Sequence, residues 1–306
     1  MKELMWYIFH VLRKSAPHRL KTICIRQTRN SKEMKHDNLS KVQLMILEVF
    51  KPVYQYLQDN QIEYYMLGGT LLGAIRHEGF IPWDDDMDIG IPRPQYEKFL
   101  QEIQAVLPEH LKLETYYDET PHHYYFSRIV DTRYALERLG SIEAREENVW
   151  IDIFPLDGMP NHAIPRKIHM FRLLATRAMY HISCFEKVNL KRPNRPLSER
   201  IVIKFVQITG FGRHGDTRKK LDKLDRLLKK YPVEKSNYFV NFMGQYKFKE
   251  MFPKTIYGDG ALYPFEDYQL MGPKDYDAVL TQLYGDYMTP PSDTDKNAHA
   301  AVLKDE

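Results

Sequence analysis

The sequence predicts an α+β fold, with a mixed sheet and surrounding helices in the first half of the chain and a mostly helical second half. Apolar residues recur at three- and four-residue spacing from Val42 to Leu57, which is typical of a core-facing helix. Several short apolar or alternating runs follow between Ile62 and Phe154, which is typical of strands. Beyond Pro160 the spacing becomes helical again, so helices surround one sheet.

The elements of the first half follow from local signals. The first helix begins after Asn38-Leu39-Ser40, and a short buried strand is expected over 62–67. Gly68-Gly69 predicts a tight turn that leads directly into a helix over 70–76. A second strand is expected over 83–91, because Pro92 and Pro94 end its alternation.

Later elements follow the same logic. An amphipathic helix is expected from Tyr96 to Val106, and three further strands over 111–117, 124–132 and 148–154. In the second half a charged helix is expected over 216–230. One helix face there carries six apolar residues, Phe171, Leu174, Ala175, Ala178, Ile182 and Phe185.

Composition narrows the function classes. The 306 residues are 43% hydrophobic and 28% charged, which is typical of a globular protein and excludes disordered and collagen-like chains. Lys and Arg number 44 against 41 Asp and Glu, so bulk charge gives no reason to expect a nucleic-acid partner. Cys24 and Cys184 form no metal or disulfide pattern, and no run approaches the roughly 18 apolar residues that span a bilayer, so a cytoplasmic location is expected.

Basic charge is concentrated at the start of the chain. Residues 1–35 carry nine Lys or Arg against Glu3 and Glu33, and an apolar stripe from Leu4 to Leu12 precedes Arg13 and Lys14. This composition fits an interfacial helix that contacts the inner face of the cell membrane through residues 1–36, and it fits equally a helix packed on the body. The predicted organisation is a basic amphipathic extension (1–37), a catalytic core (38–160) and a mostly helical part packed on that core (161–306).

The strongest chemical signal is an acidic cluster inside the predicted strand over 83–91. Since side chains alternate along a strand, Asp84, Asp86 and Asp88 are expected to share one face. Crowded carboxylates repel one another unless a cation or abundant water neutralises them, and oxygen-only ligands favour Mg²⁺ or Mn²⁺ over Zn²⁺. An acidic turn in solvent is the alternative, although the apolar side chains of Trp83 and Met87 are not typical of a fully solvated loop.

Two further features lie near this cluster in the predicted order. Gly68, Gly69 and Thr70 stand between a strand and a helix, where backbone amides can approach a phosphate, although such turns are common. Asp152 lies between two isoleucines in a later strand, as a third metal ligand, a base or only the polar face of that strand. Arg76 follows the short helix, where it can neutralise phosphate or complement the helix dipole.

The segment LGGTLLGAIRHEGFIPWDDDMDIGIPRPQYEKF, residues 67–99, closely resembles the LicD family, which also includes fukutin-related proteins. Two later blocks, WIDIFPLDG at 150–158 and YGDYM at 284–288, fall in the family's order, so the resemblance spans most of the chain after Asn38. It implies a nucleotidyltransferase-like fold. The family's paired aspartates fall on Asp86 and Asp88, with Asp84 before them, and its third acidic position falls on Asp152.

The resemblance implies transfer of a phospho-alcohol from a CDP-alcohol to a sugar hydroxyl of a cell-surface glycan, with release of CMP. CDP-choline is the favoured donor, with ribitol or glycerol phosphate as alternatives. The acceptor would be a teichoic acid, lipopolysaccharide, capsule or lipid-linked oligosaccharide. Asp86, Asp88 and Asp152 would be catalytic, all four aspartates would bind the metal, and Gly68, Gly69, Thr70 and Arg76 would contact the donor phosphates.

Two other functions remain open from the sequence. A true nucleotidyltransferase would use the same carboxylates and release pyrophosphate instead of CMP. A noncatalytic glycan- or membrane-binding protein would suit the basic start and the 21 Tyr, but binding alone gives no reason for the carboxylate cluster. Aromatic residues that include Trp83 and Trp150 can form a cage for a quaternary ammonium, but core packing is the favoured interpretation. The remaining members of that aromatic set are Tyr124, Tyr125 and Phe126.

Overall fold

The computed structural model describes residues 39–118, 125–138, 146–185, 197–212, 215–292 and 301–303. Residues 41–306 form one compact unit, to which all the elements below belong. The predicted amphipathic helix near the N-terminus lies outside the described residues. Within the described residues, no helix combines the length and the apolar character that crossing a bilayer requires.

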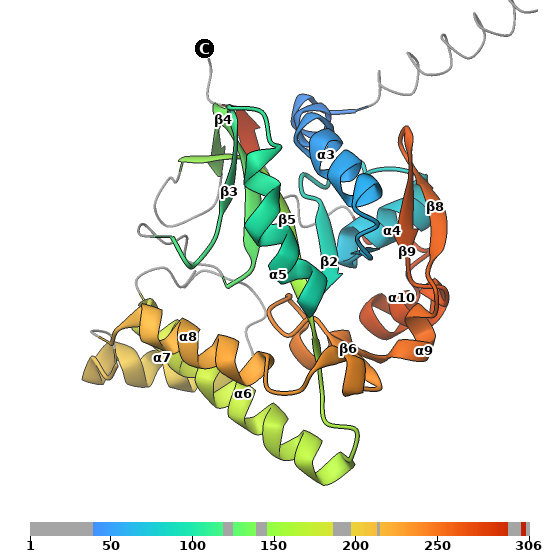
Figure 1. Ribbon diagram of the computed structural model, residues 1–306. Coiled ribbons are helices and arrows are strands. Elements are labelled where there is room, and N and C mark those ends of the chain that lie inside the picture. The colour runs from blue at the N-terminus through green and yellow to red at the C-terminus, as the bar shows by residue number, and fades with distance from the viewer. Residues whose placement is uncertain are drawn as a thin grey trace, which may run out of the picture. The chain divides into compact units, whose positions relative to one another are not determined.

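Among the described residues, an eight-stranded mixed sheet runs through this unit (Figure 1). Its main path is β1 (Tyr65–Met66), β2 (Asp88–Pro92), β5 (Glu146–Gly158), β4 (Ser127–Arg138) and β10 (Ala301–Leu303). The pair β2–β5 is parallel, whereas the other pairs are antiparallel. β3 (Leu111–Glu114) pairs with β4, and β6 (Tyr238–Val240) pairs with both β5 and β7 (Met251–Pro253). The predicted α+β fold is therefore confirmed.

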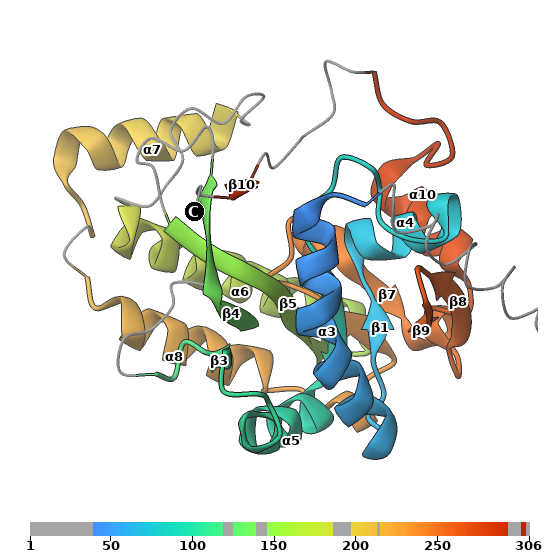
Figure 2. The same ribbon diagram turned by 90° about the horizontal axis from the view of Figure 1, so that it is seen from above.

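Two helices cover the strand β5. α3 (Lys41–Asp59) and α5 (Arg93–Glu102, continued by a 3₁₀ turn at Ile103–Ala105) both pack against it, and Figure 2 shows them on the same side. The predicted periodicity of α3 is confirmed, because Val49, Phe50 and Val53 are completely buried. Burial of such a stripe, rather than intrinsic helix propensity, accounts for most of the stability of a helix like this one.

The predicted strand over 83–91 is shorter than expected. A turn at 81–84, in which the Asp84 amide donates to the Ile81 carbonyl at 2.9 Å, precedes an extended segment, and β2 begins only at Asp88. Pro82 occupies the second position of this turn, where its fixed φ is favourable. Alternation within a strand therefore does not place Asp84 and Asp86, because both precede β2.

The turn at Gly68-Gly69 is replaced by the start of a helix. α4 (Gly68–His77) begins at Gly68, two residues earlier than predicted, and follows directly on β1. Gly68 has φ +47°, a value in the left-handed region that favours glycine. The chain thus passes from the sheet into the helix within one residue, Leu67, whose amide donates to the Asp88 carbonyl at 3.1 Å.

The second half contains more strand than the sequence predicted. Its helices are α6 (Ala163–Ser183), α7 (Leu197–Thr209), α8 (Thr217–Leu228), α9 (Lys254–Tyr257) and α10 (Tyr276–Tyr284), with 3₁₀ turns at Val233–Lys235 and Lys247–Glu250. The strands β6 and β7 and the hairpin β8 (Ala261–Phe265) and β9 (Tyr268–Gly272) were not predicted. They are short and lack a run of alternating apolar residues, so no periodic pattern marks them as strands.

Helix α6 packs on α8 with a face other than its most apolar one. Leu173 and Tyr180 are buried, whereas Phe171 is 72% exposed and Leu174 is 41% exposed. The apolar face recognised in the sequence is exposed from Phe171 to Ala178, whereas at its C-terminal end Ile182 is half-buried and Phe185 is buried.

A buried polar network joins β5 and α5 to α8. Arg93 donates to both carboxylate oxygens of Asp157 at 2.7 Å and to the Tyr125 hydroxyl at 2.8 Å. That hydroxyl donates to Asp225 at 2.6 Å, and Lys229 lies 2.8 Å from the same carboxylate. Arg93 is the central cation of this network: it neutralises Asp157 and shares Asp225 with Lys229.

Candidate functional site

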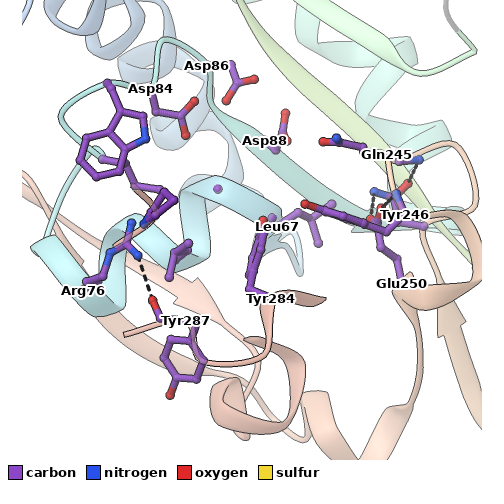
Figure 3. Close-up of a pocket in the computed structure, with 18 of the residues that line it drawn as sticks. Leu67, Arg76, Asp84, Asp86, Asp88, Gln245, Tyr246, Glu250, Tyr284 and Tyr287 are labelled. Atoms are coloured by element: carbon purple, nitrogen blue, oxygen red, sulfur yellow. Dashed lines mark hydrogen bonds between the residues drawn. The ribbon is translucent and has the colours of Figure 1, made fainter. Parts of the chain in front are cut away.

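A cavity of about 490 Å³ lies where α4, the segment before β2, the loop from β6 to β7 and the end of α10 meet. Figure 3 shows Asp84, Asp86 and Asp88 along one wall, with Tyr246 and Tyr284 across from them. The cavity is predominantly acidic and aromatic, and Arg76 is the one cationic side chain among its described lining residues. The lining residues are Leu67, Gly68, Gly69, Leu72, Arg76, Ile81, Trp83, Asp84, Asp86, Asp88, Phe154, Asn241, Gly244, Gln245, Tyr246, Glu250, Tyr284, Asp286, Tyr287, Thr289 and Pro291.

The three predicted aspartates do come together, although not by strand alternation. Asp84 and Asp86 are hydrogen-bonded to each other through their carboxyl groups. Asp88 begins β2, where its amide donates to the Thr70 hydroxyl at 2.8 Å and its carbonyl accepts from Leu67. The extended segment before β2 therefore places the alternate residues Asp84, Asp86 and Asp88 on one wall. Of these three, only Asp88 is held by the hydrogen bonds of the β-sheet.

Burial and mutual repulsion raise the proton affinity of this wall. Burial, and after it the neighbouring Asp86 charge, raise the pKa of Asp84 to about 8. Burial likewise raises the pKa of Asp88 well above its ordinary value, with repulsion from Asp86 and Asp152 as the next causes. A site that holds protons on aspartates near neutral pH is short of positive charge, as a cation-binding site is before it is filled.

This electrostatic arrangement predicts an unusual dependence of stability on pH. Because the pKa of Asp84 is about 8 in the folded chain and 3.8 when unperturbed, folding takes up a proton between these values. The free energy of unfolding should therefore fall as pH rises from 4 to 8. In thermal melts with chelator present, Asp84→Asn should flatten this slope and raise Tm at pH 8, whereas the exposed control Asp59→Asn should keep the wild-type slope. An unchanged slope in Asp84→Asn would contradict the prediction.

Helix α4 presents its N-terminus to the cavity. Gly68 and Gly69 both line it, and amides in the first turn of a helix have no partners within that helix. The backbone lies very close to the acidic wall: a Cβ on Gly69 would be 2.6 Å from Oδ2 of Asp84, and one on Gly68 would be 3.7 Å from both Oδ2 of Asp88 and the Tyr284 hydroxyl. Larger residues at Gly69 would displace Asp84.

Thr70 and Arg76, the other predicted donor-binding residues, have different positions. Thr70 does not line the cavity, because it is buried and its hydroxyl accepts the hydrogen bond from the Asp88 amide. Its contact aligns α4 with β2. Arg76 does line the cavity, and Nη1 donates to the Tyr287 carbonyl at 2.9 Å while the guanidinium lies 5.8 Å from the centre of the Trp83 ring.

Asp152 lies behind the acidic wall rather than in it. It is the ladder partner of Asp88 in the parallel pair β2–β5, but it is not among the lining residues. Its Oδ1 accepts from Nε of Arg128 at 2.7 Å, and both side chains are buried. Burial raises the pKa of Asp152 to about 6, against the lowering effect of Arg128. Asp152 therefore lies beside Asp88 in the register of the two strands, and its carboxylate is already paired with the cationic side chain of Arg128.

The site fits a divalent cation through the type and charge of its donor groups more than through the way in which they are arranged. Within the described residues, no group of three or more His, Cys, Asp or Glu side chains is arranged to hold a metal ion. The donor set of Asp84, Asp86 and Asp88 nevertheless consists of carboxylate oxygens, the ligands that Mg²⁺ and Mn²⁺ prefer. Burial first, and neighbouring carboxylates second, raise the pKa values of Asp84 and Asp88. The residues fit such an ion by type and charge.

The sequence analysis missed the wall formed by the loop between β6 and β7. Glu250 accepts from Asn241 Nδ2 at 2.7 Å and from the Tyr246 amide at 2.8 Å, and the Asn241 side chain accepts from the Gly244 amide. This clamp presents Gln245 and Tyr246 to the cavity. Burial raises the pKa of Glu250 to about 7. In the sequence, the only local signals of this wall were an acidic residue, Glu250, and an Asn near a glycine. The YGDYM block, in contrast, did indicate Tyr284 and Tyr287.

The described members of the aromatic set weighed as a cation cage do not converge on the cavity. Tyr125, Phe126 and Trp150 are buried, as core packing predicted, and Tyr124 lies outside the described residues. Trp83 alone lines the cavity, together with aromatic rings from the second half, Tyr246, Tyr284 and Tyr287.

The acidic wall of the site falls within a recognisable family domain. A family model described as LicD/FKTN/FKRP, nucleotidyltransferase domain, matches residues 61–180, which include α4, the acidic cluster and Asp152. The chain is 29% identical over 269 residues to the lipopolysaccharide cholinephosphotransferase LicD of Haemophilus influenzae, an alignment that covers 87% of this chain and 97% of the relative.

Shorter segments of the chain match other proteins. Over 44 residues, 14% of this chain and 9% of the relative, it is 46% identical to the human ribitol 5-phosphate transferase FKRP. Over 70 residues, 23% of this chain and 21% of the relative, it is 41% identical to the protein RT0683 of Rickettsia typhi. Residues 61–180 therefore carry a LicD-type nucleotidyltransferase domain, and the chain is similar to a LicD cholinephosphotransferase over most of its length.

Proposed function

We propose that this protein transfers a phospho-alcohol, phosphocholine in the first instance, from a CDP-alcohol to a sugar hydroxyl of a cell-surface glycan and releases CMP. The observation that carries the proposal is the wall of Asp84, Asp86 and Asp88 at a cavity next to the N-terminus of α4. A helix N-terminus favours phosphate, and a carboxylate cluster favours the divalent cation that accompanies a diphosphate.

The choice of choline is supported by two observations. The alignment with the cholinephosphotransferase covers 87% of this chain, whereas the alignment with the ribitol 5-phosphate transferase covers 14%. The cavity also combines the rings of Trp83, Tyr246 and Tyr284 with carboxylates, a surface that attracts a quaternary ammonium by cation–π and Coulombic terms. Ribitol phosphate and glycerol phosphate are the alternative groups.

The chain's own residues would bind and orient the donor. Asp84, Asp86 and Asp88 would hold Mg²⁺ or Mn²⁺, which when bound supplies positive charge to the diphosphate. The amides of Gly68 and Gly69 and the Arg76 guanidinium would contact the phosphates, and Asp88 is kept in place by Thr70. Asp152 would act either as a further ligand or as the acceptor of the hydroxyl proton, while Oδ1 of its carboxylate accepts a hydrogen bond from Arg128.

The location and acceptor belong to the same proposal. A teichoic acid, lipopolysaccharide, capsule or lipid-linked oligosaccharide would present the sugar hydroxyl, and the enzyme would work on the cytoplasmic side, where CDP-alcohols are made. Nucleotidyl transfer is the second candidate, because the family domain is itself described as a nucleotidyltransferase domain.

The test is product identity. With Mg²⁺ and an extracted glycan acceptor, we expect CMP release from CDP-choline in preference to CDP-ribitol and CDP-glycerol. The amount of phosphocholine incorporated into the glycan should equal the amount of CMP released. Pyrophosphate release from CTP instead would favour nucleotidyl transfer. If no donor is turned over with any acceptor while the folded protein binds glycan, the noncatalytic alternative would be supported.

A further inference from the structure

Helix α6 carries large apolar side chains on the side opposite its buried face. Leu173 and Tyr180 are buried, whereas Ile164 is 75% exposed, Ile168 57% and Phe171 72%. Spacings of four and three residues place these three side chains in one stripe along the helix. The helix therefore has two apolar faces. The inner face packs against the protein, and the outer face has no protein partner among the described residues.

Helix α7 repeats this arrangement. Val206 is completely buried, but Leu197, Ile201, Phe205 and Ile208 are all more than half exposed and recur at spacings of three and four residues. The segment after α7 returns to α6, since a Cβ on Gly212 would lie 2.7 Å from Ile182. We call seven of the exposed apolar residues of the two helices, those that form these stripes, the α6–α7 apolar surface: Ile164, Ile168, Phe171, Leu197, Ile201, Phe205 and Ile208.

This concentration is unusual within the described part of the chain. Outside residues 164–211, the exposed large apolar side chains there are scattered over separate elements: Val106, Tyr117, Leu262 and Met288. Scattered exposed apolar residues are normal, whereas a concentration of them on neighbouring elements marks an interaction site.

Charge decides which partner this surface fits. Over its 21 residues α6 has four Lys or Arg and no Asp or Glu. Lys167 and Arg172 are exposed and stand on opposite sides of the apolar stripe, each within about 80° of it at 100° per residue. On α7, Arg200 and Lys204 are also exposed.

We propose that the α6–α7 apolar surface docks on a membrane that contains anionic lipid, with the helices lying in the interfacial plane. An outer apolar stripe edged by long cationic side chains is the pattern of an interfacial helix, because the stems of Lys and Arg cover apolar surface while their charges reach the headgroups. A second copy of the chain would bring like charges together, and residues 1–35, with nine Lys or Arg against two Glu, would do the same. The inference does not depend on the proposed activity.

Vesicle flotation of the full chain tests the surface. We expect it to float with vesicles of phosphatidylglycerol and phosphatidylcholine, and to bind pure phosphatidylcholine vesicles much less. Ile168→Glu/Phe171→Glu should weaken partition at least about tenfold, because each buried side chain of this size contributes one to a few kcal/mol. The matched control is Leu262→Glu, on the hairpin β8–β9, where the side chain is 59% exposed. Unchanged Tm would show that all three chains are folded.

A depth measurement separates this surface from the N-terminal segment. An environment-sensitive fluorophore would be attached through Phe171→Cys, in a chain with Cys24→Ser and Cys184→Ser, and compared with the same label attached through Leu262→Cys. We expect a blue shift and quenching by spin-labelled lipid at position 171 only. Full partition of the double variant, or a label at 171 that stays in water while the chain is bound, would overturn the proposal in favour of residues 1–36. Self-association that Phe171→Glu abolishes, without vesicle binding, would overturn it in favour of a second copy.

Discussion

Asp88→Asn is expected to lower kcat for phospho-alcohol transfer by roughly a thousandfold or more, with little loss of stability. The substitution removes one carboxylate of the acidic wall but keeps its volume, and the backbone of Asp88 stays bonded to Thr70 and Leu67. Loss of several kcal/mol of metal-dependent charge stabilisation corresponds to about this factor. Steady-state CMP release with saturating Mg²⁺ measures it, and Asp86→Asn should behave alike.

The same variants should be at least as stable as the wild type without metal. Burial and repulsion raise the pKa of Asp88 well above its ordinary value, so a neutral amide relieves an unfavourable charge. The matched control is Asp85→Asn, since Asp85 lies between Asp84 and Asp86 in the chain but does not line the cavity. Near wild-type turnover in either Asp86→Asn or Asp88→Asn would remove the acidic wall from the proposed chemistry.

Arg93→Met is expected to lower the free energy of unfolding by about 3–5 kcal/mol, the cost of breaking a buried ion pair from one side. Arg93 is 7% exposed and makes a two-bond contact with Asp157, and Nη1 also lies 3.7 Å from Asp225. Without the guanidinium, both carboxylates are left in the interior with less compensation. Urea denaturation at neutral pH measures the effect.

Two comparisons identify the mechanism of this loss. Lys98→Ala breaks an exposed pair with Glu102 at 4.0 Å and should cost less than about 0.5 kcal/mol. Arg93→Met/Asp157→Leu should recover part of the stability lost in Arg93→Met, because it removes the stranded charge. A double variant that is less stable than Arg93→Met would indicate that packing of the Arg93 side chain, not charge, is what the network supplies.

Local patterns predicted the elements that carry strong periodic or turn signals. The apolar stripe of α3, the helix after Gly68-Gly69 and the two strands that contain Asp88 and Asp152 all exist, with boundaries that differ by a few residues. The spacing of Asp84, Asp86 and Asp88 also put them on one wall. The assumed reason was wrong, because the turn at 81–84 keeps the first two out of β2.

Contacts between distant segments decided the rest of the site. The clamp of Asn241 and Glu250 lies some 150 residues from the acidic cluster in sequence, and no short pattern marks it as a cavity wall. Likewise, Arg128 as the partner of Asp152, and Thr70 as the partner of Asp88, follow from the pairing of β4 with β5 and from the position of α4 beside β2.

The sequence by itself determined the chemistry of this protein: which carboxylates stand close together, where glycine lets a helix begin beside them, and which family the motifs belong to. Only the tertiary structure decided which groups face the cavity and which apolar helix faces are buried. The physical reason is that periodicity records that a face is apolar, not what covers it. On α6 the tertiary fold buries Leu173 and leaves Phe171 outside, and this choice depends on α8, whose position no residue of α6 encodes.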